Sequence, residues 1–547
     1  MIKIRSFKHH LNIWTLLSSL FILFILLPNL SILGSLFHKA NENWIHIKTY
    51  LLKDYIINSM ILILFTGICT VLIGVVLAWL ISVYDFPFRG FLKWALILPL
   101  TVPPYMAAYT YHGIVNYTGV IQTLLRNTLQ MQVHQKYFDI MSMPGAVFIF
   151  TFFLFPYVYM ITRSFLEKQS ASLIENGRLL GRNSFEIFLY IILPISRTAI
   201  VGGVSLVVLE VLNDYGVVQY FGIPAFSTAI FKTWFAMGDL DSAVKLSSIL
   251  MFLILCILAV EKILRGRKQF SYSNTKVRPI TRQPLKGIRA LLASFFCLSV
   301  LSLGFFIPTL QLLHWSLLTY KKILNIKFLT LALNSLAMAF VASGLIIIIA
   351  LVIANYCRIN NNWLAKIYSK ITVIGYSIPA AVIAIGVIIF FIGLDQRLYW
   401  IYQMLHNHPR KLVLSTSIFM LLFAYIVRFL AIGYNSIESG FDKIGKKFFE
   451  ASRLLGKNIT QTFFAVDVKM IKPAILSGFI LVFVDILKEL PLTLILRPFN
   501  FHTLATKSFQ YANDEMVHEA AISSLIIIII SVISIYFFYR TESKEVD

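Results

Sequence analysis

Apolar stretches long enough to cross a lipid bilayer recur along the whole chain. Hydrophobic residues make up 58% of the sequence, and the mean hydropathy is +0.79, far above the average of soluble globular proteins. A helix needs about 20 mostly apolar residues to cross roughly 30 Å of hydrocarbon. The sequence therefore predicts an all-α polytopic membrane protein with about twelve transmembrane helices, near 13–36, 58–83, 93–116, 144–163, 198–218, 245–263, 288–313, 333–357, 371–393, 412–433, 473–492 and 520–538.

The first apolar run has features of a signal peptide. Lys3, Arg5 and Lys8 precede it, as basic residues precede the apolar core of a secretory signal. The run continues from Leu11 to Leu36, which is longer than such a core, and no cleavage site with small residues follows. We therefore expect an uncleaved first span.

The net charge of +23 would suggest nucleic acid as a partner if the chain were soluble. With the N-terminus in the cytoplasm, the predicted cytoplasmic segments hold about thirty Lys and Arg residues, against about fourteen outside. The densest cluster joins the two halves of the chain, at Arg265, Arg267, Lys268, Lys276, Arg278, Arg282, Lys286 and Arg289. We interpret it as a linker that meets anionic headgroups of the bilayer, with no nucleic-acid role.

The four cysteines lie singly within predicted spans, at Cys69, Cys256, Cys297 and Cys357. Their spacing matches neither a metal site nor a disulfide framework. We assign them to packing and expect no metal site and no cofactor.

Two polar, glycine-centred segments, 275 residues apart, have nearly the same sequence. The first is Glu175-Asn-Gly-Arg-Leu-Leu-Gly181, followed by Leu193-Pro194, and the second is Glu450-Ala-Ser-Arg-Leu-Leu-Gly456, followed by Pro473. The same shift aligns Phe188 with Phe463, Arg197 with Lys472, Glu210 with Asp485, and Asp214 with Glu489. Because the step contains six spans, both copies have the same orientation, which predicts parallel repeats about an axis along the membrane normal.

Each polar segment is predicted to form a helical elbow. In the first copy Ser172 and Glu175 have the spacing of a capping box, and Glu175 also meets the positive end of the helix dipole. Gly181 would end this helix, and a second helix would run from Ser184 toward Pro194. The elbow is expected to offer its apolar side chains to a partner, namely Leu179, Leu180, Phe185 and Phe188, with Leu454, Leu455, Phe463 and Phe464 in the second copy. The alternative is an ordinary helix-turn-helix connection, which a duplication in register disfavours.

Acidic residues occur in pairs within two predicted spans. Glu210 and Asp214 are four apart and share a helix face, and Asp485 and Glu489 repeat the arrangement beside Lys488. An ionised group at the centre of a bilayer costs about 2.5–3.5 kcal/mol, so we expect all four to face the bundle interior, a water-filled path or the outer mouth. Two interpretations stay open: an acidic vestibule that a cation passes, or locks between helices in which Lys488 and backbone groups pair with the acids.

The duplicated segment resembles the E-A-A-x-x-x-G coupling loop of binding-protein-dependent ABC importer permeases. The chain is similar to a fused form that carries two copies of a domain that usually dimerises. Two further stretches resemble ferric-iron importer permeases, from Glu210 through Asp214-Tyr215-Gly216 and from Lys488-Glu489-Leu490-Pro491 to Asp514-Glu515. The chain departs from that pattern at Tyr215, where Phe is usual, and at Lys469, where a proline is missing.

This resemblance implies a multi-pass subunit of a bacterial inner membrane, with both termini in the cytoplasm. It implies a cytoplasmic ABC ATPase dimer and a periplasmic substrate-binding protein as partners, and passage of ferric iron to the cytoplasm by alternating access. The residues implied in coupling are Glu175, Gly181, Phe188, Pro194, Glu450, Gly456 and Phe463, and those expected along the path are Glu210, Asp214, Asp485 and Glu489. Tyr105, Tyr109 and Tyr111 are further candidates, although an interfacial aromatic belt explains tyrosines equally well.

The chain is not expected to be an enzyme. Gly440 to Lys446 has the spacing of a phosphate-binding loop, but Lys447 stands where Ser or Thr must bind magnesium. ATP hydrolysis is therefore expected in a separate subunit.

The expected division of the chain is as follows: residues 1–53 hold the first span and a periplasmic loop, 54–264 a first permease domain with its coupling loop at 175–194, 265–329 the basic linker and the seventh span, and 330–538 a second permease domain with its coupling loop at 450–473.

Alternative functions are a permease for thiamine, phosphonate or polyamines, an ion-coupled secondary transporter, and a membrane scaffold or sensor that uses the elbows only for docking.

Overall fold

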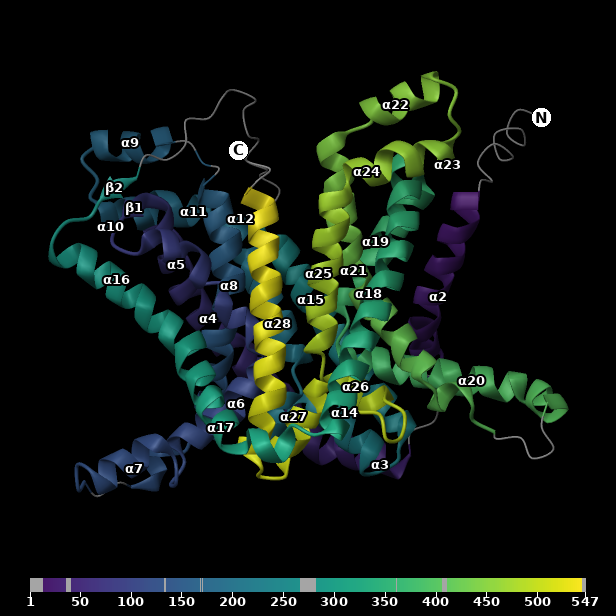
Figure 1. Cartoon of the computed structure of the whole chain (residues 1–547), viewed down its shortest axis with the longest axis horizontal. Coiled ribbons are helices and arrows are strands. Elements are labelled where there is room, and N and C mark those ends of the chain that lie inside the picture. The colour runs from purple at the N-terminus through teal and green to yellow at the C-terminus, as the bar shows by residue number, and fades with distance from the viewer. Residues whose placement is uncertain are drawn as a thin grey trace.

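The computed structural model describes residues 13–35, 41–131, 134–167, 169, 171–265, 282–360, 362–405 and 411–543. These residues are almost entirely helical (Figure 1). The two strands found among them, β1 (Tyr84–Asp85) and β2 (Gln283–Pro284), form one short parallel pair. The predicted all-α membrane fold is confirmed. Most of the basic linker, from Arg267 to Arg278, lies outside the described residues.

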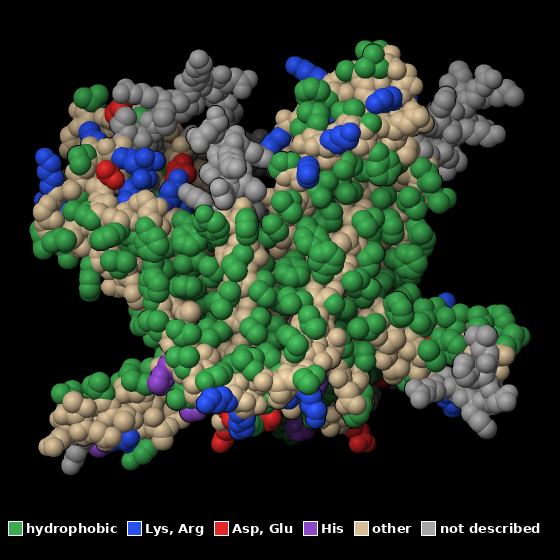
Figure 2. Space-filling model, in the orientation of Figure 1, with side chains coloured by type: hydrophobic (Ala, Val, Ile, Leu, Met, Phe, Trp, Pro, Cys, Tyr) green, Lys and Arg blue, Asp and Glu red, His purple; other side chains and the backbone are tan. Residues whose placement is uncertain are grey.

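The helices of the described residues reproduce the predicted spans. Eight are long and apolar enough to cross a membrane, at Glu42–Val83, Gln135–Glu167, Leu240–Arg265, Ile288–Ile323, Ile326–Ile359, Ala380–Met404, Ile418–Ile444 and Val517–Phe537. Three bent helix pairs bring the number to eleven, and a shorter apolar helix covers Ile13–Pro28. Apolar side chains cover the middle of the bundle on the face shown in Figure 2, and Lys and Arg side chains gather at the two ends of the bundle.

The two halves repeat the same order of elements. The first runs through α4 (Leu52–Val83), α8 (Met143–Glu167), α9 (Ala171–Leu179), α10 (Ser184–Ile187), η4 (Phe188–Ile192), α11 (Leu193–Ile195), α12 (Arg197–Asn213), α13 (Gly216–Tyr220), α14 (Phe226–Phe235) and α15 (Leu240–Arg265). The second runs through α18 (Ile326–Ile359), α21 (Ile418–Ile444), α22 (Lys447–Leu454), α23 (Ile459–Thr462), η7 (Phe463–Asp467), α24 (Val468–Met470), α25 (Lys472–Leu487), α26 (Pro491–Leu496), α27 (Leu504–Asn513) and α28 (Val517–Ser543). From α10 to α13 the offset stays at 275 residues at the start of every element, as the sequence repeat predicted.

Prolines interrupt one span in each half. In the first, α5 (Arg89–Ala95) and η2 (Leu98–Thr101) end before Pro103, and α6 (Pro104–Val115) and α7 (Val120–Asn127) follow. In the second, α19 (Trp363–Ser377) ends before Pro379, and α20 (Ala380–Leu405) follows. Continuous third and ninth spans, over 93–116 and 371–393, were therefore wrong predictions: Val102 and Ile378 are extended, because a residue before proline is pushed out of the helical region. Beyond the breaks, α7 and α20 extend away from the bundle on opposite sides of the same end (Figure 1).

The first helix of each half packs on the other half. Figure 1 shows α2 (Ile13–Ser35) beside α18 and α19, where Ser19 Oγ lies 2.8 Å from Tyr368 Oη. The second half begins with α16 (Ile288–Leu301), η5 (Ser302–Phe306) and α17 (Ile307–Ile323), which lie against α5 and α6. There Ser294 donates a hydrogen bond to the Pro87 carbonyl over 3.0 Å. Each half therefore holds the other with one helix, which joins the two repeats into one body.

A glycine allows one of these exchanged helices to approach closely. A Cβ on Gly304 would lie 2.7 Å from the Phe152 carbonyl oxygen and 2.8 Å from Pro99 Cγ. Since backbone and a proline ring border the site, the neighbours cannot yield easily.

We predict that Gly304→Leu destabilises the protein, because overpacking a tight contact costs about 1–3 kcal/mol. Gly344→Leu is the control, since open space surrounds a Cβ at that position of α18. The measurement is the thermal unfolding of both variants in detergent. Equal melting temperatures for the two variants would contradict the tight packing of η5 on the first half.

Candidate functional site

The first polar segment forms the elbow that the sequence predicted. The helix α9 ends at Leu179, and Gly181 follows with φ +78°, a backbone conformation that glycine adopts most cheaply. The chain then turns into α10, and α12 follows after a bend of 71°. Leu179 and Leu180 project into solvent, with 85% and 83% of their surface exposed.

The helix cap of this elbow lies where the sequence analysis did not place it. Asn183 and Glu186 form a capping box at the start of α10, with Asn183 Oδ1 2.8 Å from the Glu186 amide. The side chain of Ser172 lies outside the described part of the chain, and Glu175 lies in the middle of α9. The capping box found among the described residues of this elbow therefore belongs to its second helix.

The second segment forms a matching elbow at the same end of the bundle (Figure 1). Gly456 has φ +84°, and Asn458 and Gln461 form the capping box of α23. Leu454 and Leu455 are exposed like their counterparts, at 88% and 83%, and the bend into α25 is 74°. Glu450 lies in the first turn of α22. Four exposed leucines beside two left-handed glycines form an apolar surface typical of a docking site.

The two elbow phenylalanines that were expected to face a partner face the protein instead. Phe188 packs on Trp79 of α4, with ring centroids 5.7 Å apart, and Phe463 is buried against Trp14 of α2 at 4.6 Å. The π-helical turns η4 and η7 direct both rings toward the spans. Phe185 and Phe464 are exposed, as predicted. Pro194 opens the short helix α11, and Lys469 takes its place in α24 without changing the length of that helix.

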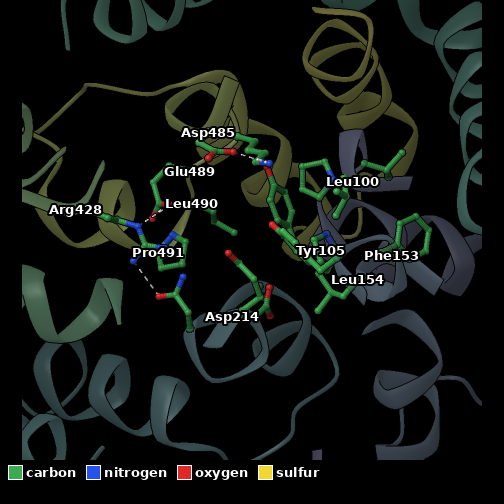
Figure 3. A pocket seen from close by; sticks show the side chains of 18 of the residues that line it. Leu100, Tyr105, Phe153, Leu154, Asp214, Arg428, Asp485, Glu489, Leu490 and Pro491 are labelled. Atoms are coloured by element: carbon green, nitrogen blue, oxygen red, sulfur yellow. Dashed lines mark hydrogen bonds and ion pairs between the residues drawn. The ribbon is translucent and has the colours of Figure 1, made fainter. Parts of the chain in front are cut away.

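The four acidic residues line one cavity between the two halves (Figure 3). Its volume is about 100 Å³, room for a few water molecules. Glu210 and Asp214 come from the end of α12, and Asp485 and Glu489 from the end of α25. The expectation that all four face the interior is met. The remaining wall comes mainly from η2, α6, α8, α13, α19, α21 and α26, and includes Tyr105, Phe153, Tyr157, Tyr376 and Arg428.

Asp214 and Glu489 hold equivalent positions in the backbone. Asp214 Oδ1 accepts a hydrogen bond from the Val217 amide over 2.8 Å, and Glu489 Oε1 accepts one from the Leu492 amide over 3.0 Å. Each carboxylate therefore satisfies an amide that a new helix leaves unpaired at its start. Each span thus ends beside the cavity, and a short helix begins there.

Two hydrogen bonds across the cavity join the halves, and two ion pairs lie within the second half. Arg428 of α21 donates to Asn213 Oδ1 over 3.1 Å and lies 3.4 Å from Glu489 Oε2. Tyr376 donates to Glu210 Oε1 over 3.0 Å, and Lys488 lies 2.8 Å from Asp485. The interpretation of the acids as locks between helices thus describes several of their contacts.

Acids still outnumber bases in this cavity, by four carboxylates to Arg428 and Lys488. The hydroxyl of Tyr105 is buried and has no hydrogen-bond partner among the described residues. Tyr109 contacts Ser508 at 2.9 Å, and Tyr111 donates to the Leu303 carbonyl, so Tyr105 is the one of the three candidate tyrosines that lines the cavity. The described residues contain no group of three His, Cys, Asp or Glu placed to hold a metal ion.

The sequence analysis missed Arg428. It lies within the predicted tenth span, where a charged residue is costly, and this was a usable signal. The 275-residue shift places Phe153 at the equivalent position of the first half, so the repeat gave no indication of a basic residue.

Comparison with known proteins agrees with this geometry. Residues 346–543 match the family model described as binding-protein-dependent transport system inner membrane component. The chain is 23% identical over 504 residues to the Fe(3+)-transport system permease protein FbpB 2 of Haemophilus influenzae, covering 90% of this chain and 91% of that protein. It is 21% identical to the probable ABC transporter permease protein y4fN of Sinorhizobium fredii, covering 86% and 84%.

Part of the chain also matches permeases of a second kind of transport system. The spermidine/putrescine transport system permease protein PotB of Escherichia coli is 25% identical over 213 residues, covering 37% of this chain and 76% of that protein. With two elbows, two parallel repeats and relatives along nearly its whole length, the chain is an ABC transporter permease of the binding-protein-dependent type, with two permease domains fused in one polypeptide.

Proposed function

We propose that this permease passes ferric iron from a periplasmic binding protein to the cytoplasm across the inner membrane. The observation that carries the proposal is the acidic cavity between the two halves, with four carboxylates against two basic side chains. Ferric iron prefers hard oxygen ligands, which the carboxylates and the buried hydroxyl of Tyr105 can offer. The similarity to the ferric-iron permease of Haemophilus influenzae supports the same substrate.

The two elbows are the surfaces through which ATP hydrolysis would drive the permease. Each carries an exposed Leu-Leu pair followed by a left-handed glycine, and both lie at one end of the bundle. We assign that end to the cytoplasm, with one subunit of an ABC ATPase dimer on each elbow and both chain termini on the same side. Closure of the ATPase dimer would push the elbows together and rotate the halves about the cavity.

Polyamine transport is the second candidate, because the PotB proteins match over 213 residues. A polyamine is also a cation, so the charge of the cavity suits both substrates.

Uptake of radiolabelled iron distinguishes the two substrates. Cells that carry this chain, its cognate ATPase and its binding protein are expected to accumulate ferric iron, and excess spermidine should leave the rate unchanged. Cells without the chain are the control. Accumulation of labelled spermidine with no iron uptake would overturn the iron assignment and leave the permease function in place.

The elbow glycines allow a test of coupling. We predict that Gly181→Asp with Gly456→Asp abolishes uptake while the chain stays in the membrane, because a side chain at positive φ strains the turn and a charge disrupts an apolar docking surface. Gly238→Asp is the matched control, since Gly238 also has positive φ and open surroundings but lies outside both elbows. Normal uptake by the double variant would refute the coupling role.

The acidic cavity allows a test of the path. Asp214→Asn with Glu489→Gln should lower cation uptake at least about tenfold, because one carboxylate 4 Å from a unit charge contributes about 1–4 kcal/mol. Both amides can still accept the hydrogen bonds from Val217 and Leu492, so the helix starts should remain intact. Asp514→Asn, an exposed acid beyond α27, is the control. An unchanged uptake rate together with unchanged ATPase co-purification would assign the acids to packing alone.

A further inference from the structure

A buried ion pair connects the second elbow to a span. Arg358, near the end of α18, lies 2.8 Å from Asp467 Oδ1 at the end of η7, and their side chains are 8% and 0% exposed. The Arg358 side chain also donates to the Gly445 carbonyl over 2.6 Å and lies over the Phe441 ring at 4.6 Å. One guanidinium thus joins α18, the turn before α22, and the elbow itself.

The first elbow has no ion pair at the same place among the described residues. The repeat is offset by 276 residues between α4 and α18, where Asn58-Ser59 matches Asn334-Ser335, so Arg358 corresponds to Ser82. At the 275-residue offset of the elbows, Asp467 corresponds to Ile192, and both Ser82 and Ile192 are buried. The elbow phenylalanines differ as well: Phe188 packs on Trp79 of its own half, whereas Phe463 packs on Trp14 of α2. Trp14 also donates a hydrogen bond to Thr460 over 3.2 Å. The two elbows therefore match in their exposed residues and differ in the residues that contact the spans.

A buried ion pair of this kind adds little to the free energy of unfolding. Replacing a buried pair by well-packed apolar residues is often neutral or stabilising, and the first elbow has no charge at this place, where Ser82 and Ile192 are buried. The second oxygen of Asp467, Oδ2, is buried and accepts no hydrogen bond from the described residues, so the pair is not fully satisfied. What an ion pair adds over an apolar contact is direction, because the planar guanidinium fixes the angles at which its partners lie.

We propose that Arg358 and Asp467 are positioning residues that fix the angle of the second elbow relative to α18, so that the second elbow is held more rigidly than the first. The proposal rests on the proposed function of the elbows as ATPase-docking surfaces. A displacement of the second elbow then moves α18 directly, whereas the first elbow transmits movement to α4 through uncharged contacts that can slide, such as that of Phe188 with Trp79.

Distance measurements between spin labels test this rigidity without any substrate. The second elbow is labelled at Leu454 and at Ile326, an exposed residue at the far end of α18. The first is labelled at Leu179 and at Tyr50, which is likewise exposed and precedes α4. In the purified permease with its ATPase, the wild-type Leu454–Ile326 distribution should be single and narrower than that of Leu179–Tyr50.

Asp467→Asn should broaden the Leu454–Ile326 distribution and leave Leu179–Tyr50 unchanged. Arg358→Lys, which keeps the charge but loses the planar fork, should broaden it as well. Arg358→Ser with Asp467→Ile installs the residues of the first half, so it should fold and give a distribution as broad as that of the first elbow. Because this double variant removes both charges together, it tests the proposal even if Asp467→Asn fails to reach the membrane.

A coupling readout completes the test. Transport per ATP hydrolysed should fall at least about fivefold in Asp467→Asn, the lower end of usual coupling between sites, with the ATPase still co-purifying. Lys322→Gln is the control, since it breaks the exposed Lys322–Glu519 pair at the other end of the bundle. A narrow Leu454–Ile326 distribution in Asp467→Asn and in the double variant would overturn the proposal. A failure to transport iron with the label results as expected would overturn the substrate assignment alone.

Discussion

The cost of placing charge in hydrocarbon determines where the polar groups of this permease lie. Four carboxylates near the ends of two spans cannot face lipid, and all four line one cavity between the repeats. There they accept hydrogen bonds from helix starts at Val217 and Leu492 and pair with Arg428 and Lys488. The same requirement applies at the second elbow, where Arg358 and Asp467 are buried as a pair. Polar groups therefore mark the places at which the halves, or a half and its elbow, must hold a defined arrangement.

The duplicated architecture is consistent with the proposed mechanism. Parallel repeats bring both elbows to one end and both acidic span ends to the cavity, so in the proposed mechanism a push on the elbows would act on both walls of the cavity. The exchange of α2 and α16–α17 packs each half against the other. Fusion in one chain also allows the halves to diverge, and they have done so at Arg428, which corresponds to Phe153, and at the Arg358–Asp467 pair, which corresponds to Ser82 and Ile192.

The sequence predicted the features that follow from hydropathy and repetition. The spans, the left-handed glycines at Gly181 and Gly456 and the gathering of the four acids all follow from local pattern or from the 275-residue shift. It did not predict features that depend on tertiary packing. The π-helical turns that direct Phe188 and Phe463 inward have no clear sequence pattern. The break before Pro379 lies within a long apolar run, which predicted a continuous span. The exchange of first helices depends on contacts between segments hundreds of residues apart. Arg428 was detectable as a charge within a span, but the equivalent position of the first half holds Phe153 and not a basic residue.

One copy of this chain carries two matching elbows, and we propose that each docks one ATPase subunit, so the mass of the intact transporter decides between possible assemblies. Native mass spectrometry of the complex purified through this chain should show one copy of the permease with two ATPase subunits. Gly456→Asp alone should weaken the binding of one of those subunits. A complex of two permease chains with two ATPase subunits, or of one chain with a single ATPase subunit, would rule out two docking elbows on each chain.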